Sequence, residues 1–234
     1  MLKKIFYNRK LMISLFVVLI VIATLVAVGP VLYSAFMGKG VKTEGINADK
    51  ISPATTEIDG NWQVIQGNAY NYTSAGFTFY EILPAEETVT SGSTGAVTGQ
   101  ATVEDETLQS GRVVVDMQEL STDKQVRDQN MKTKLFETDE YPEATFEITK
   151  PAKLDAVPDN GDIAQVELDG ELTIKDKSKK VTATFDIVRD EDTIILAGDI
   201  PINRVDFDVN TPDLIAAKIA EEGEVNIRIT FGKD

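Results

Sequence analysis

The chain contains two different hydrophobic patterns, one after the other. Residues 11–28 are 18 apolar or small residues in a row, and no charged residue occurs between Lys10 and Lys39. About 20 apolar residues in a helix, rising about 1.5 Å each, span the hydrocarbon core of a bilayer. From Asn61 onward, apolar and polar residues alternate with a period of two, which is typical of half-buried strands. The pattern predicts one membrane-spanning helix followed by an all-β domain.

Basic residues flank the apolar run unevenly. Four precede it and two follow it closely: Lys3, Lys4, Arg9 and Lys10, then Lys39 and Lys42. The positive-inside rule therefore predicts a cytoplasmic basic tail over residues 1–10, a transmembrane signal anchor over 11–37 and an extracytoplasmic remainder. A cleaved signal peptide is the alternative, but its apolar region is about 7–15 residues long and ends at an A-x-A-like site. Both interpretations place the later residues outside the cytoplasm.

The remaining residues divide into a linker and one domain. Residues 38–60 are polar, with Gly, Pro and Thr scattered through them, and they predict a flexible tether. Residues 61–234 predict about nine strands separated by turn signals. The alternation is clearest in the segments 77–80, 97–103, 113–117, 166–174, 181–187, 194–202 and 225–231. Strands in this number, each with one apolar face, indicate an antiparallel barrel or sandwich.

Two stretches interrupt the strand pattern. Residues 122–136 predict a long connection that contains a short helix. Thr211, Pro212 and Asp213 form a typical helix start, and the apolar residues after them predict a helix that ends at Gly223. Such a helix would pack against one end of the barrel.

Composition narrows the function. Residues 51–234 carry 16 basic and 36 acidic residues, so the domain repels nucleic-acid phosphates and is not expected to bind them. The chain has no Cys and no His, which removes thiolate chemistry, the usual general base and the commonest metal ligand. We expect neither an enzyme nor a cofactor. The segment from Asp206 to Asn210 resembles the start of a calcium loop, but Thr211 and Ala217 stand where Gly and Glu are required.

Several ordered motifs point to one family. They are Ser121-Thr122, Arg127-Asp128-Gln129-Asn130-Met131, Leu135-Phe136, Tyr141-Pro142-Glu143-Ala144-Thr145-Phe146, Leu168-Asp169-Gly170-Glu171-Leu172-Thr173-Ile174 with Lys179-Lys180-Val181, and Ile202-Asn203-Arg204-Val205-Asp206-Phe207. Together these motifs resemble the YceI-like family over roughly residues 61–234. The motifs depart from the family pattern at three places: Asp208 and the pair Lys175-Asp176 stand where Gly is common, and Asn130 stands where His is frequent.

The resemblance implies an up-and-down, lipocalin-like antiparallel barrel with short helices. It also implies that the interior holds a polyisoprenoid or another amphiphilic chain. The expected ligand-binding residues are Phe77, Phe79, Arg127, Phe146, Leu172, Phe185 and Phe207. The alternative for the apolar residues is plain core packing. For Arg127 the alternative is an ion pair or helix cap that fixes its loop, and for Arg204 it is a structural pair with Asp206.

The favoured function is therefore a membrane-anchored, extracytoplasmic lipid-binding protein at a bacterial cell surface. One alternative is a non-catalytic adhesive or structural domain with a filled barrel, in which large side chains would occupy every interior layer. The other is a carboxylate-based hydrolase, which would place two carboxyl groups about 5 Å or 6.5–9.5 Å apart in a polar cleft. The oligomeric state is not predicted.

Overall fold

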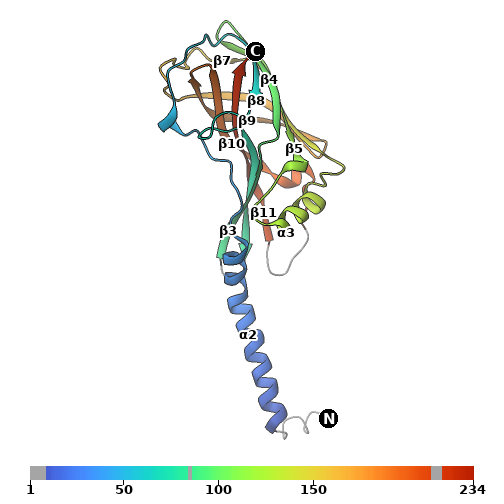
Figure 1. The fold of residues 1–234 in the computed structure, drawn as a ribbon. Helices are drawn as coiled ribbons and strands as arrows, with labels where there is room; N and C mark the ends of the chain where they lie inside the picture. The colour runs from blue at the N-terminus through green and yellow to red at the C-terminus, as the bar shows by residue number, and fades with distance from the viewer. Residues whose placement is uncertain (1–8, 84–85, 212–217) are drawn as a thin grey trace.

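The computed structural model describes residues 9–83, 86–211 and 218–234. An apolar helix stands below a β-barrel in Figure 1. The helical elements are α2 (Arg9–Met37), η1 (Ala48–Lys50), η2 (Met117–Glu119), α3 (Gln125–Asn130), the π-helical turn η3 (Met131–Leu135) and η4 (Arg204–Phe207). The strands are β1 (Gly60–Ile65), β2 (Ser74–Leu83), β3 (Glu86–Thr94), β4 (Val97–Glu104), β5 (Thr107–Asp116), β6 (Glu143–Ile148), β7 (Ala152–Lys153), β8 (Ala164–Ile174), β9 (Lys177–Asp190), β10 (Thr193–Asn203) and β11 (Lys218–Lys233).

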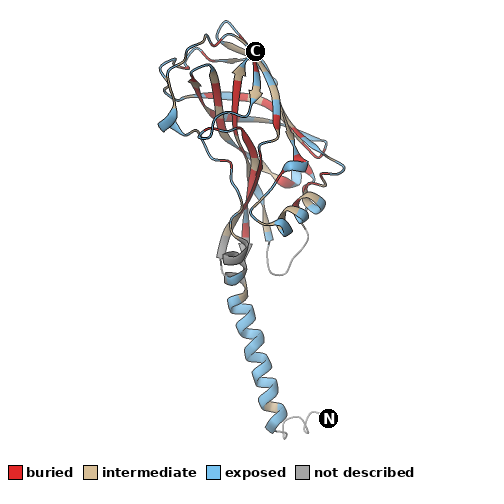
Figure 2. Cartoon of the chain, in the orientation of Figure 1, coloured by how far each residue is buried: buried red, intermediate tan, exposed pale blue. Residues whose placement is uncertain are grey.

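Helix α2 projects from the domain and exposes its apolar side chains. Within Arg9–Gly29, which is long and apolar enough to cross a membrane, no residue is buried. Phe16 is 65% exposed, and Figure 2 shows nearly all of the span as exposed. In a helix of a soluble globular protein, the apolar side chains lie along one face and pack against the core. Helix α2 therefore has the length and apolar composition of a membrane span, and also those of a signal sequence.

Eight strands close into an antiparallel barrel in the order β1-β4-β5-β6-β8-β9-β10-β11. The barrel closes where β11 pairs with β1, in a register that runs from Trp62 opposite Lys233 to Ile65 opposite Thr230. A closed sheet satisfies the backbone groups that an edge strand would leave unpaired. The predicted fold, an antiparallel barrel with short helices behind an apolar helix, is confirmed.

The hairpin of β2 and β3 extends the wall beyond the closed part. Strand β2 follows β1 along the same edge of β11, with Ser74 opposite Arg228 and Ile82 opposite Lys218. Strand β3 pairs with β2 along its length. In Figure 1 this hairpin reaches the end of α2, whereas β7 and the C-terminus lie at the opposite end. We call the end beside α2 the proximal end and the other the distal end.

Residues 38–60, expected to be a flexible tether, instead lie bound along the barrel wall. We call this segment the strap. Both ends and the middle are hydrogen-bonded to the domain. The bonds include Ser91 N to Lys39 O at 2.9 Å, Arg228 Nη1 to Gly45 O at 3.0 Å, Asn47 N to Asn71 Oδ1 at 2.7 Å, Ser52 N to Asp190 Oδ1 at 2.8 Å and Lys233 Nζ to Glu57 O at 2.8 Å. The domain is thus joined to α2 by an ordered segment.

The prediction of a helix after Thr211 is wrong for residues 218–223, the part of it that the structure describes. Residues 212–217 lie outside the described residues, but Lys218 to Gly223 belong to strand β11. Gly223 pairs with Phe79 on one side and with Ile202 on the other. Pairing with two neighbouring strands outweighs a local capping signal, because propensity is a weak preference beside tertiary contacts.

Candidate functional site

The barrel interior contains two apolar cavities. The proximal cavity has a volume of about 90 Å³, and its lining includes Phe77, Phe79, Leu120, Phe136, Leu172 and Val209. The distal cavity has a volume of about 70 Å³, and its lining includes Trp62, Val103, Leu108, Leu154, Ile187 and Phe231. The two spaces share part of their lining, so the barrel interior is not completely filled by side chains. An apolar space of this kind accepts apolar groups.

The segments between β5 and β6 cover the proximal cavity. Met117 from η2, Leu120 after it and Phe136 after η3 all line the cavity and are buried. The ring of Phe136 lies 5.3 Å from that of Phe77, centroid to centroid. Sequence analysis did not select Met117, Leu120 or Phe136 as ligand-binding residues. Leu120 and Phe136 lie beside short helices, where alternation along a strand gives no signal. Met117 ends the alternating segment 113–117, but the pattern alone did not separate a cavity-lining position from plain core.

Four of the predicted ligand-binding residues meet at the proximal cavity. Phe77 and Phe79 come from β2, Phe146 from β6 and Leu172 from β8, and all four line this cavity. The pairing of Phe146 with Leu172 brings the last two side by side. Their contact with a ligand stays a prediction, and their shared position makes it testable.

Phe185 and Phe207 take different positions. Phe185 is fully buried and lies outside both described linings, with its ring 6.3 Å from that of Phe146 in an edge-on arrangement. Phe207 is buried in the same hydrophobic cluster as Phe77 and Phe79 but is also absent from the described linings. Both rings are buried in the apolar core, and neither belongs to a described cavity lining.

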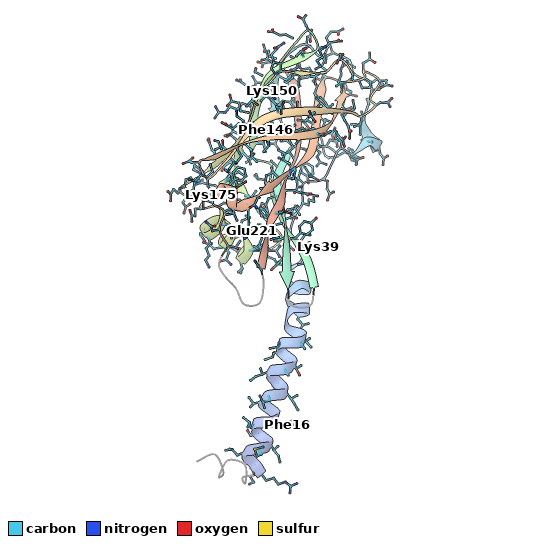
Figure 3. All side chains as sticks on the ribbon, turned by 180° about the vertical axis from the view of Figure 1, so that it is seen from behind. Phe16, Lys39, Phe146, Lys150, Lys175 and Glu221 are labelled. Carbon is cyan, nitrogen blue, oxygen red and sulfur yellow. The ribbon has the colours of Figure 1, made fainter. Side chains whose placement is uncertain are left out.

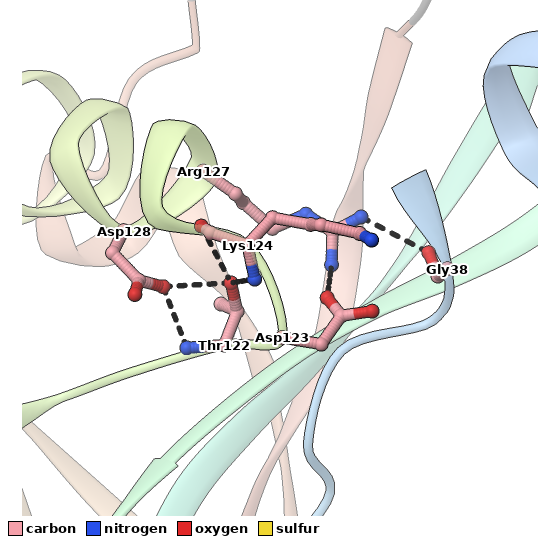
Figure 4. Close-up of polar contacts among 6 residues, drawn as sticks. All are labelled: Gly38, Thr122, Asp123, Lys124, Arg127 and Asp128. Carbon is pink, nitrogen blue, oxygen red and sulfur yellow. Dashed lines mark hydrogen bonds and ion pairs between the residues drawn. The ribbon is translucent and has the colours of Figure 1, made fainter. Parts of the chain in front are cut away.

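Arg127 lies outside the barrel interior, on α3 (Figure 4). Its Nη1 is 2.8 Å from Asp123 Oδ1, and its Nη2 donates to the carbonyl oxygen of Gly38 at 3.0 Å. Asp128 accepts hydrogen bonds from the backbone and hydroxyl of Thr122, at 2.6 and 2.7 Å. These contacts fix the α3 connection and join it to the strap, which is the structural alternative considered for Arg127.

Arg204 is buried beside the proximal cluster but does not pair with Asp206. Its guanidinium donates to the carbonyl oxygens of Ala220, Val209 and Ile219 and to the hydroxyl of Thr211. Asp206 faces outward, 3.5 Å from Lys179 Nζ. The predicted Arg204–Asp206 pair is therefore wrong. Burial lowers the pKa of Arg204, and Glu221 raises it in part.

Two departures from the family motifs have a conformational explanation. Asp208, where Gly is common, has a φ of 54°, and its backbone closes η4. Lys175 and Asp176 have φ values of 49° and 57° in the turn between β8 and β9. Asp tolerates the left-handed region better than most residues. Lys175 is held in that turn by Glu137, at 3.1 Å, and by the carbonyl oxygen of Asp208.

One acidic group lies on the cavity side of β2. Glu81 follows Phe77 and Phe79 at alternate positions of the strand and is 9% exposed, whereas Tyr80 is 53% exposed. Burial raises the pKa of Glu81 above its ordinary value, and the positive charge of Arg127 lowers it in part. Within the described residues, this carboxyl marks where the apolar lining of β2 becomes polar.

Comparisons with known proteins agree with this architecture. The model of the YceI-like domain matches residues 52–231. The crystal structure of Burkholderia cenocepacia BcnA is 20% identical, with a TM-score of 0.52 over 67% of this chain and 95% of that one. A polyisoprenoid binding domain from Saccharophagus degradans, implicated in plant cell wall breakdown, is 15% identical, with a TM-score of 0.51 over 70% and 99%. No match was found among curated protein sequences.

The family match covers most of the chain, including the strap from Ser52 onward and nearly all of β11. The structural matches cover nearly the whole of both solved proteins and show the same fold. The chain belongs to the family of proteins with a YceI-like domain.

Proposed function

We propose that this protein is a membrane-anchored, extracytoplasmic binding protein, not an enzyme, that sequesters or carries a polyisoprenoid-type or other amphiphilic chain in its barrel. The observation that carries the proposal is the pair of cavities lined almost entirely by aliphatic and aromatic side chains. Burial of an apolar tail there is favourable by about 25 cal/mol per Å². The solved domain from Saccharophagus degradans, named for polyisoprenoid binding, supports the ligand class through its shared fold.

The position of the proximal cavity supports loading from a membrane. Phe136 and Leu120, which line it, lie at the barrel end where Arg127 contacts the strap just after α2. The strap holds this end beside the helix through Ser91 and Gly40, which form a bridge. If α2 lies in a bilayer, the proximal cavity faces the lipid source, and the distal cavity lies farther out.

The ligand is testable by extraction. The full chain is purified from its own membranes, and its organic extract is analysed by mass spectrometry. We expect one apolar chain per protein. Ala144→Leu, which adds carbon atoms to the proximal lining, should reduce the lipid retained, whereas Ala183→Leu, also buried but outside both described linings, should not. Repeated recovery of folded, lipid-free protein would favour a structural surface domain.

Anchoring and topology need a separate test. The intact mass of the mature protein distinguishes a retained α2 from a cleaved signal peptide. Protease added to intact cells should digest the barrel domain if it lies outside the cytoplasm. A full-length mass together with protection of the domain in intact cells and digestion after lysis would contradict the proposed orientation.

A further inference from the structure

Four inward phenylalanine rings lie over glycines of a neighbouring strand. A Cβ atom added to the glycine would lie 2.9 Å from the ring for Gly92 and Phe77 and 2.8 Å for Gly198 and Phe185. It would lie closer still for Gly223 and Phe79 and for Gly170 and Phe146. No side chain other than hydrogen fits beneath the rings without displacement. Glycine in a strand marks such a close approach. The rings therefore recline along the wall, which leaves space near the barrel axis.

Phe146 differs from the other three rings because it borders both cavities. Only Val113, Phe146 and Leu196 are common to the described linings of the two, and Phe146 is the largest of them. Figure 3 places it in the body of the barrel, between the two ends. The ring lies across Gly170 of β8 and meets Phe185 edge-on. Its position is thus fixed from two sides, at the junction of the cavities.

Cavity size makes this junction important. An engineered apolar cavity of about 150 Å³ holds one benzene molecule. The proximal and distal cavities, at about 90 and 70 Å³, are each smaller than that. A chain of several isoprene units must therefore occupy both cavities and displace side chains between them. The direct route passes Phe146.

We propose that Phe146, seated on Gly170, determines how long an apolar chain the barrel accepts. The inference rests on the proposed function and adds a specificity-determining residue to it. With the ring on the wall, a chain can pass from the proximal to the distal cavity after a modest displacement. With the ring lifted toward the axis, the chain ends in the proximal cavity.

Two substitutions move the length limit in opposite directions. In Gly170→Ala the new methyl group meets the ring and lifts Phe146 toward the axis, so long chains should be excluded. In Phe146→Leu the ring is absent, the junction widens, and longer chains should enter. The double variant should behave like Phe146→Leu, because the new methyl group then has no ring to displace. This rescue is not expected if the Gly170→Ala substitution merely weakens β8.

Gly198→Ala is the matched control. It places a methyl group under Phe185 in the same way, but neither residue belongs to the described cavity linings. Thermal unfolding followed by circular dichroism confirms that each variant is folded. The control should lose stability to a similar degree as Gly170→Ala. Because Phe185 meets Phe146 edge-on and lines neither described cavity, the control should change the length profile much less than Gly170→Ala does.

The full chain is mixed in detergent with geraniol, farnesol, geranylgeraniol and solanesol and analysed by native mass spectrometry. The masses of the complexes give the length profile directly. Loss of one buried isoprene unit, which has five carbon atoms, lowers binding by roughly a hundredfold or more when it is fully buried. Gly170→Ala should therefore reduce the ratio of longer to shorter prenols at least tenfold. An unchanged profile in all variants overturns the role of Phe146 alone. Absence of every prenol from the folded, unmodified chain overturns the proposed function and this inference with it.

Discussion

The guanidinium of Arg127 donates a 3.0 Å hydrogen bond to the carbonyl oxygen of Gly38, which links α3 to the first residue after the apolar helix. The side chain of Arg127 is 13% exposed and is also held by Asp123. This contact joins the cover of the proximal cavity to the strap. The orientation of the barrel relative to α2 thus depends on a few specific bonds.

Arg127→Ala should loosen the start of the strap without unfolding the barrel. Hydrogen bonds to charged groups contribute about 1.5–3 kcal/mol each, so loss of this one exposes the neighbouring strap backbone. Hydrogen exchange of the Val41 and Ser91 amides, which bond across the strap, should accelerate roughly tenfold or more. Lys150→Ala serves as the control. It removes the ion pair between Lys150, whose side chain is 71% exposed, and Asp169. Equal exchange in both variants would contradict the role of Arg127.

Gly40→Ala should detach the same part of the strap by a different route. Gly40 has a φ of +84°, and a Cβ atom there would lie 2.8 Å from the carbonyl carbon of Ser91. Both features disfavour any residue with a side chain. Gly45→Ala is the matched control, because a Cβ atom at Gly45 meets nothing within 4 Å. Limited proteolysis should cut the strap faster in Gly40→Ala only, and equal cutting would refute the docked strap.

Arg204→Ala should strongly destabilise the barrel. The guanidinium satisfies the carbonyl oxygens of Val209, after η4, and of Ile219 and Ala220 in β11, and its removal leaves them unpaired. We expect a loss of about 3–5 kcal/mol in the free energy of unfolding, measured by chemical denaturation. Lys177→Ala, which removes an exposed pair with Asp208, should change it by less than about 1 kcal/mol. A small loss for Arg204→Ala would show that water replaces the guanidinium.

Glu81→Gln should stabilise the protein at neutral pH but not in acid. Burial raises the pKa of Glu81 in the folded protein, so its favourable contribution exists while the carboxyl is protonated. That contribution is present below the unfolded pKa and is lost as pH rises through the raised folded pKa. The variant avoids this loss, so its advantage in melting temperature should grow with pH. A larger advantage in acid than at neutral pH would contradict the sign.

The strands were predictable because apolar and polar residues alternate along each of them, with the apolar side chains facing the barrel core. Val166, Leu168 and Leu172 are buried on one face of β8, as the alternation requires. The strap was not predictable, because its partners lie up to 183 residues away, as for Gly45 and Arg228. A polar segment with scattered glycines looks the same whether it is free or bound to a wall.

Only part of the candidate site was predictable from the sequence, because alternation shows which side chains face inward but not which of them line a cavity. Alternation and the family motifs selected Phe77, Phe79 and Phe146, which line the proximal cavity. They could not show that Phe185 lies outside both described cavity linings, since inward-facing rings are equivalent in the sequence. Nor could they show that Arg204 turns inward while Asp206, two residues later, turns to Lys179. That choice depends on the geometry of η4 and its neighbours.

A high-resolution structure of the full chain purified from its own membranes, without added lipid, tests the central claim most directly. The account predicts elongated apolar density that starts in the proximal cavity, passes Phe146 and continues into the distal cavity, with both cavities larger than about 90 and 70 Å³. Two small cavities without ligand density, unchanged in repeated preparations, would contradict it.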